Sequence, residues 1–222
     1  MIDSHKIDYS KLDTLNVSRE TFLELDEFKE MILDENKKIN LISQHTEELA
    51  RDRHIIDCAQ IIDLIDENHL SCTDLGSGSG LPGLVIAIIK KKQKSKMKFF
   101  LYEKSFKKSN FLKKVINKFE LNAEVINQNI FDQKKINSDL IVARAFKPLP
   151  VILDLVTKNF DDFKDIILFL GKSGKSSIEQ CLQNWNLEFI EKKSVTEKDS
   201  IIIKINKVSK KKMKEKIISV IN

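Results

Sequence analysis

The stretch that decides the fold runs from Asp74 to Gly83 and reads Asp-Leu-Gly-Ser-Gly-Ser-Gly-Leu-Pro-Gly. It holds four of the six glycines in a chain of 222 residues, and the other two are Gly171 and Gly174. Average usage near 7 % would give roughly 15 glycines in a chain of this length. A chain that uses so little glycine and places most of it in one loop needs backbone freedom or close backbone approach there.

Short apolar runs typical of buried strands alternate with helical patterns around this loop. A strand over 72–75 ends at the glycines, and Leu84 to Ile89 opens a helix. Further strands are expected at 98–102, 125–126, 140–143 and 166–170, and a helix at 106–119 has apolar positions at Phe106, Phe111, Leu112, Val115, Ile116 and Phe119. Strands that alternate with helices imply parallel βαβ units. We therefore predict an α/β fold with an open, doubly wound sheet.

The two ends of the chain differ from this central pattern. Residues 18–38 place apolar side chains at helical spacing behind Ser18, a predicted N-cap, and a second helical pattern runs from about 47 to 66. Ser176 and Glu179 match a capping box for a helix that reaches Trp185, and 189–190 with 201–205 predict a hairpin. We divide the chain into a helical N-terminal extension (1–66), an α/β domain (67–206) and a basic C-terminal tail (207–222).

Composition excludes several classes of protein. The longest strictly apolar run, Leu84 to Ile89, has six residues, whereas a membrane-spanning helix needs about 20. The N-terminus shows no apolar segment of a secretory signal. Three widely spaced cysteines without a Cys-x-x-Cys pattern argue against a disulfide framework and a zinc site. We expect a cytoplasmic protein without a bound metal and without a membrane anchor.

Charge is distributed unevenly along the chain. Residues 1–70 hold 8 basic and 17 acidic side chains, a net charge of −9, while residues 71–222 hold 30 basic and 16 acidic side chains, a net charge of +14. A basic surface is where a polyanion such as a nucleic acid would bind. Solvated charge runs in a lysine-rich proteome are the alternative explanation.

Three ligands compete for the glycine loop. A dinucleotide is favoured by Gly78-x-Gly80-x-x-Gly83 with Glu103 twenty residues beyond, although Gly76 and Pro82 disturb the register of that fingerprint. A phosphate-binding P-loop at 171–176 lacks its upstream glycine.

The third candidate is S-adenosylmethionine. Class I methyltransferases that use this cofactor carry acid-x-Gly-x-Gly-x-Gly after the first strand and an acid at the end of the second, and Asp74, Gly76, Gly78, Gly80 and Glu103 match without a register shift. Asp74 is then expected to hold the ammonium group of the methionine moiety, and Glu103 the ribose hydroxyls. The register favours this methyl donor over the dinucleotide.

Four blocks in order resemble one methyltransferase family, RsmG (GidB), over about residues 20–205. They are Asn40-Leu41-Ile42-Ser43, Arg53-His54-Ile55-Ile56-Asp57-Cys58, the loop 74–83, and Ala143-Arg144-Ala145-Phe146. The resemblance implies a Rossmann-like class I fold, S-adenosylmethionine as cofactor with S-adenosylhomocysteine as product, and methylation of N7 of a guanine in 16S ribosomal RNA.

The resemblance also implies which residues bind the cofactor. Gly76 and Leu81 match loop positions that contact it, Ile130 and Phe131 match, after a one-residue gap, the pair that packs at the adenine, and Arg144 matches an arginine beside it. Leu81 stands where many members have Phe, and Glu103 where many have Asp.

Features of the chemistry agree with an N7 acceptor, which has a free lone pair and needs no deprotonation. The Asn/Asp-Pro-Pro-aromatic turn of enzymes that methylate exocyclic base nitrogens is replaced by Arg144-Ala145-Phe146. No cysteine lies between Cys72 and Cys181 to serve as the nucleophile of a 5-methylcytosine enzyme. A catalytic residue is not identified.

For the RNA we predict contacts from residues on the cofactor side of the sheet. The lysines that follow the carboxyl end of a strand, and would bind phosphates, are Lys104, Lys107 and Lys108. The lysines of 90–98 lie at the opposite end and are expected either to be solvated or to stabilise the C-terminus of a helix. Phe146 is either a stacking partner for the target guanine or a core aromatic. Arg53 contacts RNA or covers a helix surface. We expect a monomer that acts on 16S ribosomal RNA or a precursor of the small subunit; an NAD-dependent oxidoreductase and a non-catalytic RNA-binding module remain the alternatives.

Overall fold

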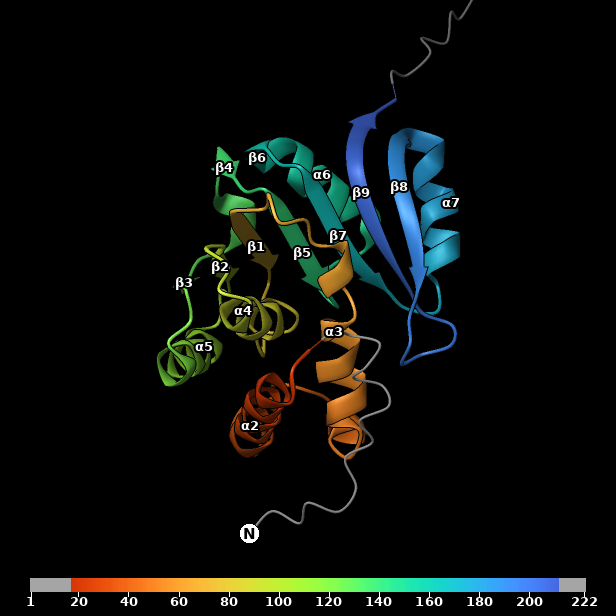
Figure 1. Ribbon diagram of the computed structural model, residues 1–222. Helices are drawn as coiled ribbons and strands as arrows, with labels where there is room; N and C mark the ends of the chain where they lie inside the picture. Colours follow the sequence, from red (N-terminus) through yellow and green to blue (C-terminus); the bar gives the residue numbers. More distant parts are fainter. Residues whose placement is uncertain (1–16, 212–222) are drawn as a thin grey trace, which may run out of the picture.

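The computed structural model describes residues 17–211. Its main sheet has seven strands in the order β3-β2-β1-β5-β7-β9-β8 (Figure 1). The first five of these are parallel and comprise β1 (Ser71–Leu75), β2 (Lys98–Tyr102), β3 (Ala123–Ile126), β5 (Leu140–Arg144) and β7 (Asp165–Leu170). The strand order reverses between β1 and β5, and the crevice outside the carboxyl ends of such a pair is where open α/β sheets bind ligands.

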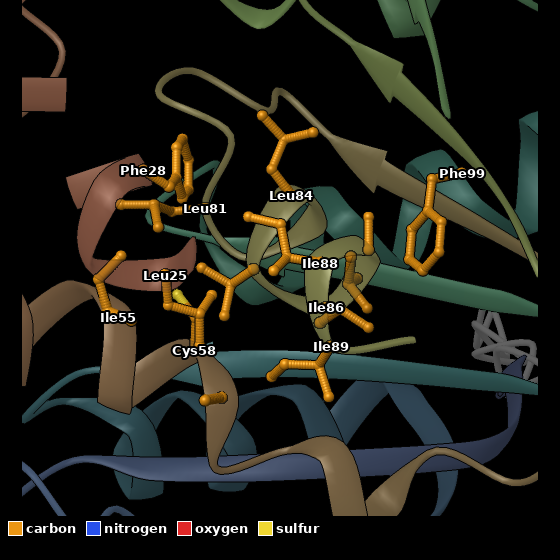
Figure 2. Packing of buried hydrophobic residues seen from close by; sticks show 14 of the residues in the cluster. Leu25, Phe28, Ile55, Cys58, Leu81, Leu84, Ile86, Ile88, Ile89 and Phe99 are labelled. Atoms are coloured by element: carbon orange, nitrogen blue, oxygen red, sulfur yellow. The ribbon is translucent and has the colours of Figure 1, made fainter. Parts of the chain in front are cut away.

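Helices cover both faces of the sheet, as the alternating strand-helix pattern predicts. Along β5, Leu140 and Val142 belong to one hydrophobic cluster and Ile141 and Ala143 to the other, because successive side chains of a strand point to opposite faces. The first cluster contains α4 (Gly83–Lys92) and α5 (Phe106–Phe119), and the second contains α6 (Leu149–Asn159) and α7 (Gly174–Asn184). Figure 2 shows the first cluster, in which α4 is buried along most of its length.

The first described helix, α2 (Arg19–Asn36), packs on α4 and α5. Ser18 is its N-cap, as predicted, since its Oγ accepts a hydrogen bond from the backbone N–H of Thr21. Leu25 and Phe28 are fully buried on its inner face. Acidic side chains of α2 form ion pairs with lysines of the two helices beneath it: Glu24–Lys92, Glu27–Lys118 and Glu35–Lys114.

The second predicted helix, from about 47 to 66, is wrong as a single element. Within these bounds the chain instead forms three short pieces, the wide π-type turn η2 (Arg51–Ile56), α3 (Asp57–Ala59) and η3 (Ile62–Leu64), and η1 (Gln44–Thr46) precedes them. Residues 54–61 are all buried except Asp57, which is half-buried. The π-type turn over 51–56 and the turns after Ala59 replace the regular period that the sequence pattern assumes, and this run packs against α2 and α4.

The C-terminal hairpin is confirmed but is longer than predicted. Strand β8 (Trp185–Lys193) pairs with β9 (Ile201–Lys210), which is antiparallel to β7. The first four residues of the predicted tail therefore belong to β9, where Lys207 forms an ion pair with Glu188 of β8; residues 212–222 lie outside the described part.

Two other local predictions need correction. The helix before the hairpin begins at Gly174 with Ser173 as its N-cap, so Ser176 lies inside the helix, where its hydroxyl donates to the carbonyl of Ser173. The sequence patterns also missed a small parallel pair formed by β4 (Ile136–Asn137) and β6 (Phe160–Asp162). Within residues 17–211, no helix combines the length and the apolar character needed to cross a bilayer.

Candidate functional site

The glycine loop leaves the carboxyl end of β1 in a conformation that side chains would obstruct. Gly76 has a φ of +66°, and a Cβ added there would lie 2.4 Å from Cδ2 of Phe146. Gly78 has a φ of +56°, but a Cβ there would meet open space beyond a contact with the Gly76 carbonyl at 3.8 Å. Gly76 is therefore required by its neighbour as well as by its backbone angle, whereas Gly78 leaves room for a ligand over the backbone.

Asp74, at the end of β1, is buried beneath this loop. Its Oδ2 accepts a hydrogen bond of 3.1 Å from the backbone N–H of Gly83, at the start of α4. Its Oδ1 is buried and has no hydrogen-bond partner among the described residues. Burial raises the pKa of Asp74 to about 7, against the opposing effect of the Gly83 hydrogen bond. An ionised carboxylate with an unpartnered oxygen in this position suits a cationic ligand group.

Glu103 lies at the end of β2 and connects the loop to the neighbouring strand. One carboxylate oxygen accepts from the backbone N–H of Gly78 at 3.0 Å, and the other accepts from the N–H of Ser105 at 2.7 Å. The side chain is largely buried. Each carboxylate oxygen can accept a further hydrogen bond, so Glu103 can still receive hydroxyl groups of a ligand.

The predicted apolar contacts divide into two kinds. Leu81 and Ile130 are both buried, and Figure 2 shows Leu81 beside Phe28 in the core, so a ligand in the loop would meet the backbone of Leu81 rather than its side chain. Phe131 and Phe146 are half-buried and stack on each other, with ring centroids 5.9 Å apart and planes inclined by 24°. Phe146 packs against the second cluster and is also partly exposed, so its role as a stacking partner for the target guanine stays a prediction.

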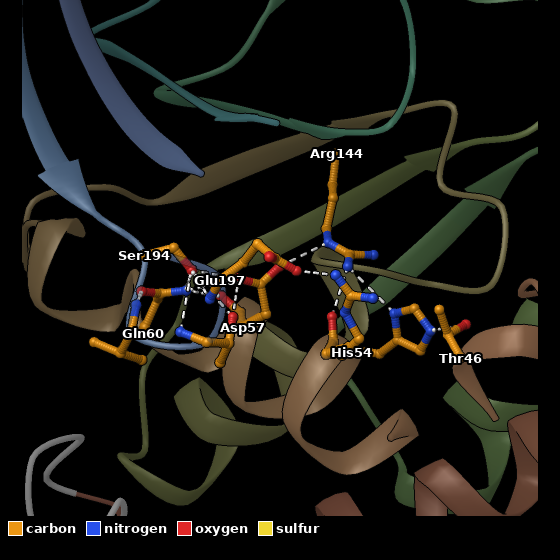
Figure 3. Close-up of polar contacts among 10 residues, drawn as sticks. Thr46, His54, Asp57, Gln60, Arg144, Ser194 and Glu197 are labelled. Carbon is orange, nitrogen blue, oxygen red and sulfur yellow. Dashed lines mark hydrogen bonds and ion pairs between the residues drawn. The ribbon is translucent and has the colours of Figure 1, made fainter. Parts of the chain in front are cut away.

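Arg144, the last residue of β5, reaches η2 and α3 of the N-terminal segment (Figure 3). Its Nε donates to Oδ2 of Asp57 at 3.0 Å, and its Nη2 donates to the carbonyl of Arg53 at 2.7 Å. The same nitrogen lies 3.2 Å from Nδ1 of His54. Burial, and next the positive charge of Arg144, lower the pKa of His54 to about 4, so the imidazole is neutral at physiological pH.

Asp57 also connects this segment to the loop between β8 and β9. Its Oδ1 accepts hydrogen bonds from Gln60 Nε2 (2.8 Å), Ser194 Oγ (3.1 Å) and Thr196 Oγ1 (2.7 Å). Arg53, predicted as an RNA contact, forms an ion pair with Glu197 of the same loop. Sequence reasoning missed Ser194, Thr196 and Glu197, and the only signal was a polar run between two predicted strands.

Two cavities of about 340 Å³ each flank the end of β5. The first is lined by Phe146 and residues at the start of α6 and α7. The second is lined by Arg144, His54, Asp57 and the loop that contains Glu197. Both open at the carboxyl edge of the sheet, so a substrate base that approaches the glycine loop would have space on either side of Arg144.

The lysines at the two ends of the sheet differ in their exposure and in their ion pairs. Lys107 and Lys108 lie at the start of α5, near the predicted cofactor edge, and neither forms an ion pair within residues 17–211. Of the two expectations for the lysines of 90–98, solvation does not hold for Lys90, which is 9 % exposed and stands in the last turn of α4. Burial lowers the pKa of Lys90.

One cluster outside the loop has the composition of a metal site. Asp66, His69 and Asp165 bring their ligand atoms within 4.8 Å of one another, although no metal-binding histidine is expected from the sequence. Lys204 lies in the cluster, with its Nζ 2.7 Å from Asp66 and 3.1 Å from Asp165. The lysine ammonium already pairs with both carboxylates, so the cluster is explained as an ion-pair network.

The chain is similar to proteins of one family over most of its length. Residues 22–205 match the family model "GidB: rRNA small subunit methyltransferase G". A protein named ribosomal RNA small subunit methyltransferase G from Pelagibacter ubique is 50 % identical over 91 % of this chain and 96 % of its own, and one from Ruegeria pomeroyi is 31 % identical over 89 % and 97 %.

Solved structures share the fold at low sequence identity. A SAM-dependent methyltransferase from Aquifex aeolicus has a TM-score of 0.54 at 12 % identity, over 82 % of this chain and 97 % of its own. The 16S rRNA methylase RmtB has a TM-score of 0.53 at 12 % identity, over 86 % and 76 %. M. capricolum TrmK in complex with S-adenosyl-homocysteine has a TM-score of 0.50 at 18 % identity, over 79 % and 74 %. These likenesses confirm the predicted Rossmann-like class I fold.

Proposed function

The chain belongs to the GidB family, rRNA small subunit methyltransferase G, and on this premise we propose that it transfers a methyl group from S-adenosylmethionine to N7 of a guanine in 16S ribosomal RNA. The observation that carries the cofactor assignment is the buried Asp74, whose Oδ1 has no partner among the described residues, beneath a loop with open space over Gly78. A ligand that is cationic at one end and carries hydroxyl groups would satisfy both Asp74 and the nearby Glu103.

The proposed cofactor contacts follow from the placement of each residue. Asp74 holds the ammonium group, and the backbone of Gly76, Gly78 and Leu81 lines the methionine moiety. Glu103 accepts from the ribose hydroxyls, while Ile130 and Phe131 pack at the adenine and Arg144 lies beside the ligand. When bound, the cofactor supplies a methyl group on a positively charged sulfur. The protein then needs to align the acceptor with this group and to exclude water.

The cysteines support an acceptor that needs no covalent catalysis. Cys58, Cys72 and Cys181 are all buried, and burial raises the pKa of each thiol. A buried thiol with a raised pKa is a poor nucleophile, which argues against 5-methylcytosine chemistry. Guanine N7 attacks through its own lone pair, so an N7 enzyme requires positioning groups rather than a base.

For the RNA we propose that phosphates bind Lys107 and Lys108 and that Phe146 contacts the target base. Arg53 borders the second cavity and, on release from Glu197, would add a further positive charge there. We propose that the N-terminal extension (1–66) precedes a cofactor-binding domain that begins at 67 and continues through β9 to Lys210, beyond the predicted boundary at 206. A monomeric state and a cytoplasmic location stay predictions.

The test combines cofactor titration with mapping of the product. Calorimetry with S-adenosylhomocysteine and with NAD distinguishes the methyltransferase from the oxidoreductase, and binding of NAD alone would refute the proposal. Unmodified 16S ribosomal RNA and small subunits are then incubated with labelled S-adenosylmethionine, and 7-methylguanine is located by strand scission. Cofactor binding without methyl transfer to either substrate would favour a non-catalytic RNA-binding module. Arg144→Ala is expected to abolish methylation in a folded protein.

A further inference from the structure

Phe106, the first residue of α5, is exposed to solvent over 69 % of its surface. Its position in the helical pattern predicts a core residue, and this prediction is wrong. Among the described residues no other large apolar side chain is as exposed; the next is Leu70 at 62 %. A single exposed apolar side chain is common on a protein surface, so the ring gains a functional meaning only from its place in the fold and from the charges beside it.

The place of Phe106 relates this ring to the proposed methyl-transfer site. It follows Glu103 by three residues, and Ser105 between them is the N-cap of α5. Both residues therefore lie at the carboxyl edge of the sheet, where β2 ends and the glycine loop also emerges (Figure 1). A nucleic acid that presents a base to the loop would pass within reach of this edge.

The charges around Phe106 favour a polyanion. The neighbours of Phe106 in the sequence include Lys104, Lys107 and Lys108. None of these lysines forms an ion pair within the described range. Farther along α5, Lys114 and Lys118 are paired with Glu35 and Glu27 of α2. Two lysines of the later turns are thus neutralised by α2, whereas the lysines beside Phe106 keep their positive charge available.

We propose that Phe106 is a stacking platform for an unpaired base of the ribosomal RNA near the target guanine, with the adjacent phosphates bound by Lys104 and Lys107. The combination of an exposed aromatic ring with unpaired cations is how proteins bind single-stranded nucleic acid. The inference rests on the proposed function, because it assigns part of the binding surface for the same substrate. A protein partner would be the alternative occupant, but it gives no reason for three unpaired lysines around the ring.

The experiment compares RNA affinity at several salt concentrations. The full chain, saturated with S-adenosylhomocysteine, is titrated with transcribed 16S ribosomal RNA and with unmodified small subunits. Phe106→Ala is expected to weaken binding about 5- to 150-fold without a change in the salt dependence, since a stacked base contributes no released counterion. Phe106→Trp should retain the affinity of the wild type. Lys107→Gln should instead make the slope of log Kobs against log salt shallower by about 0.7, the value for one phosphate contact to a single strand.

Matched controls come from the opposite edge of the sheet. Leu70→Ala removes an exposed apolar side chain before β1, and Lys96→Gln removes an exposed lysine before β2. Both should bind RNA as the wild type does, and all variants should bind S-adenosylhomocysteine equally, which checks that the site is folded.

Different failures lead to different conclusions. If the wild type methylates its RNA and Phe106→Ala binds like Leu70→Ala, the stacking platform is refuted while the proposed function stands. If Phe106→Ala weakens binding to small subunits but not to transcribed RNA that the wild type binds and methylates, the ring contacts a protein, and the proposal is likewise overturned. If the wild type itself transfers no methyl group to either substrate, the proposed function fails first.

Discussion

The substitution Asp74→Asn should raise the free energy of unfolding of the unliganded protein. It should also lower the affinity of the protein for its cofactor. A carboxyl group whose pKa moves from 3.8 in the unfolded chain to about 7 in the folded protein destabilises the charged form of the fold by about 4 kcal/mol. An amide has the same shape and no charge, and its oxygen can still accept from the N–H of Gly83.

The stability that Asp74→Asn gains over the wild type should depend on pH. Between about pH 4 and pH 7 the folded state holds a proton on Asp74 that the unfolded state has released. The contribution of Asp74 to the free energy of unfolding of the wild type therefore falls as pH rises. The advantage of Asp74→Asn should therefore increase from about 2 kcal/mol at pH 5 to about 4 kcal/mol at pH 8. Urea unfolding at several pH values, with fluorescence of Trp185 as the signal, measures this difference.

Ligand binding should change in the opposite direction. If Asp74 holds the ammonium group, wild-type affinity for S-adenosylhomocysteine rises between pH 5 and pH 8 and binding releases a proton, which calorimetry in buffers of different ionisation enthalpy detects. Asp74→Asn should bind more weakly and release no proton at this group. Equal stability of the two proteins at pH 8, or equal affinity with an unchanged pH dependence, would refute the reasoning.

Three further predictions concern the surrounding residues. Asp57→Asn keeps an acceptor for Ser194 but turns an N–H toward Nε of Arg144. Loss of this charge-assisted hydrogen bond should lower the free energy of unfolding, measured in urea, by about 1.5–3 kcal/mol and should reduce methylation. Unchanged unfolding and activity would contradict this prediction. Gly76→Ala should cost at least about 1–2 kcal/mol for the left-handed backbone alone, whereas Gly171→Ala, with no atom within 4 Å of the added Cβ, is the control that should unfold like wild type. For His54→Gln, stability should decline less steeply than in wild type as pH falls from 6.5 toward 4, because the unfolded chain protonates His54 in this window and the folded protein does not; parallel curves would refute the assignment.

The sequence predicted the elements whose signal is local. The parallel strands and the glycine loop are each defined by a few neighbouring residues, namely a short apolar run and the turn that ends it. Ser18 was found for the same reason, since an N-cap acts three residues along the chain. The alternation of strand and helix then fixes which strand ends meet at one edge, so the placement of Asp74 and Glu103 near each other could also be predicted.

Contacts between distant segments could not be predicted in the same way. Asp57 meets Thr196, 139 residues away, only because β9 pairs with β7 and brings the preceding loop back to η2. The burial of residues 54–61 depends on α2 and α4 on one side and on that loop on another, so periodicity suggested one regular helix where the chain forms short pieces. The exposure of Phe106 could not be predicted from the helical pattern for another reason. A helical side chain packs over the turn that precedes it, and the first residue of α5 has no preceding turn.

The uneven charge along the chain acquires a physical explanation from the fold. The acidic N-terminal part does not stand apart from the basic part, because Glu24, Glu27 and Glu35 of α2 pair with lysines of α4 and α5. These exposed and half-exposed pairs each contribute little to stability, but they remove positive charge from the surface that α2 covers. The start of α5 is one of the places where lysines keep no carboxylate partner among the described residues, and it lies at the edge where the glycine loop opens. An acidic helix can in this way lower the affinity of the surface that it covers for a polyanion, since phosphates bind where lysines lack a carboxylate.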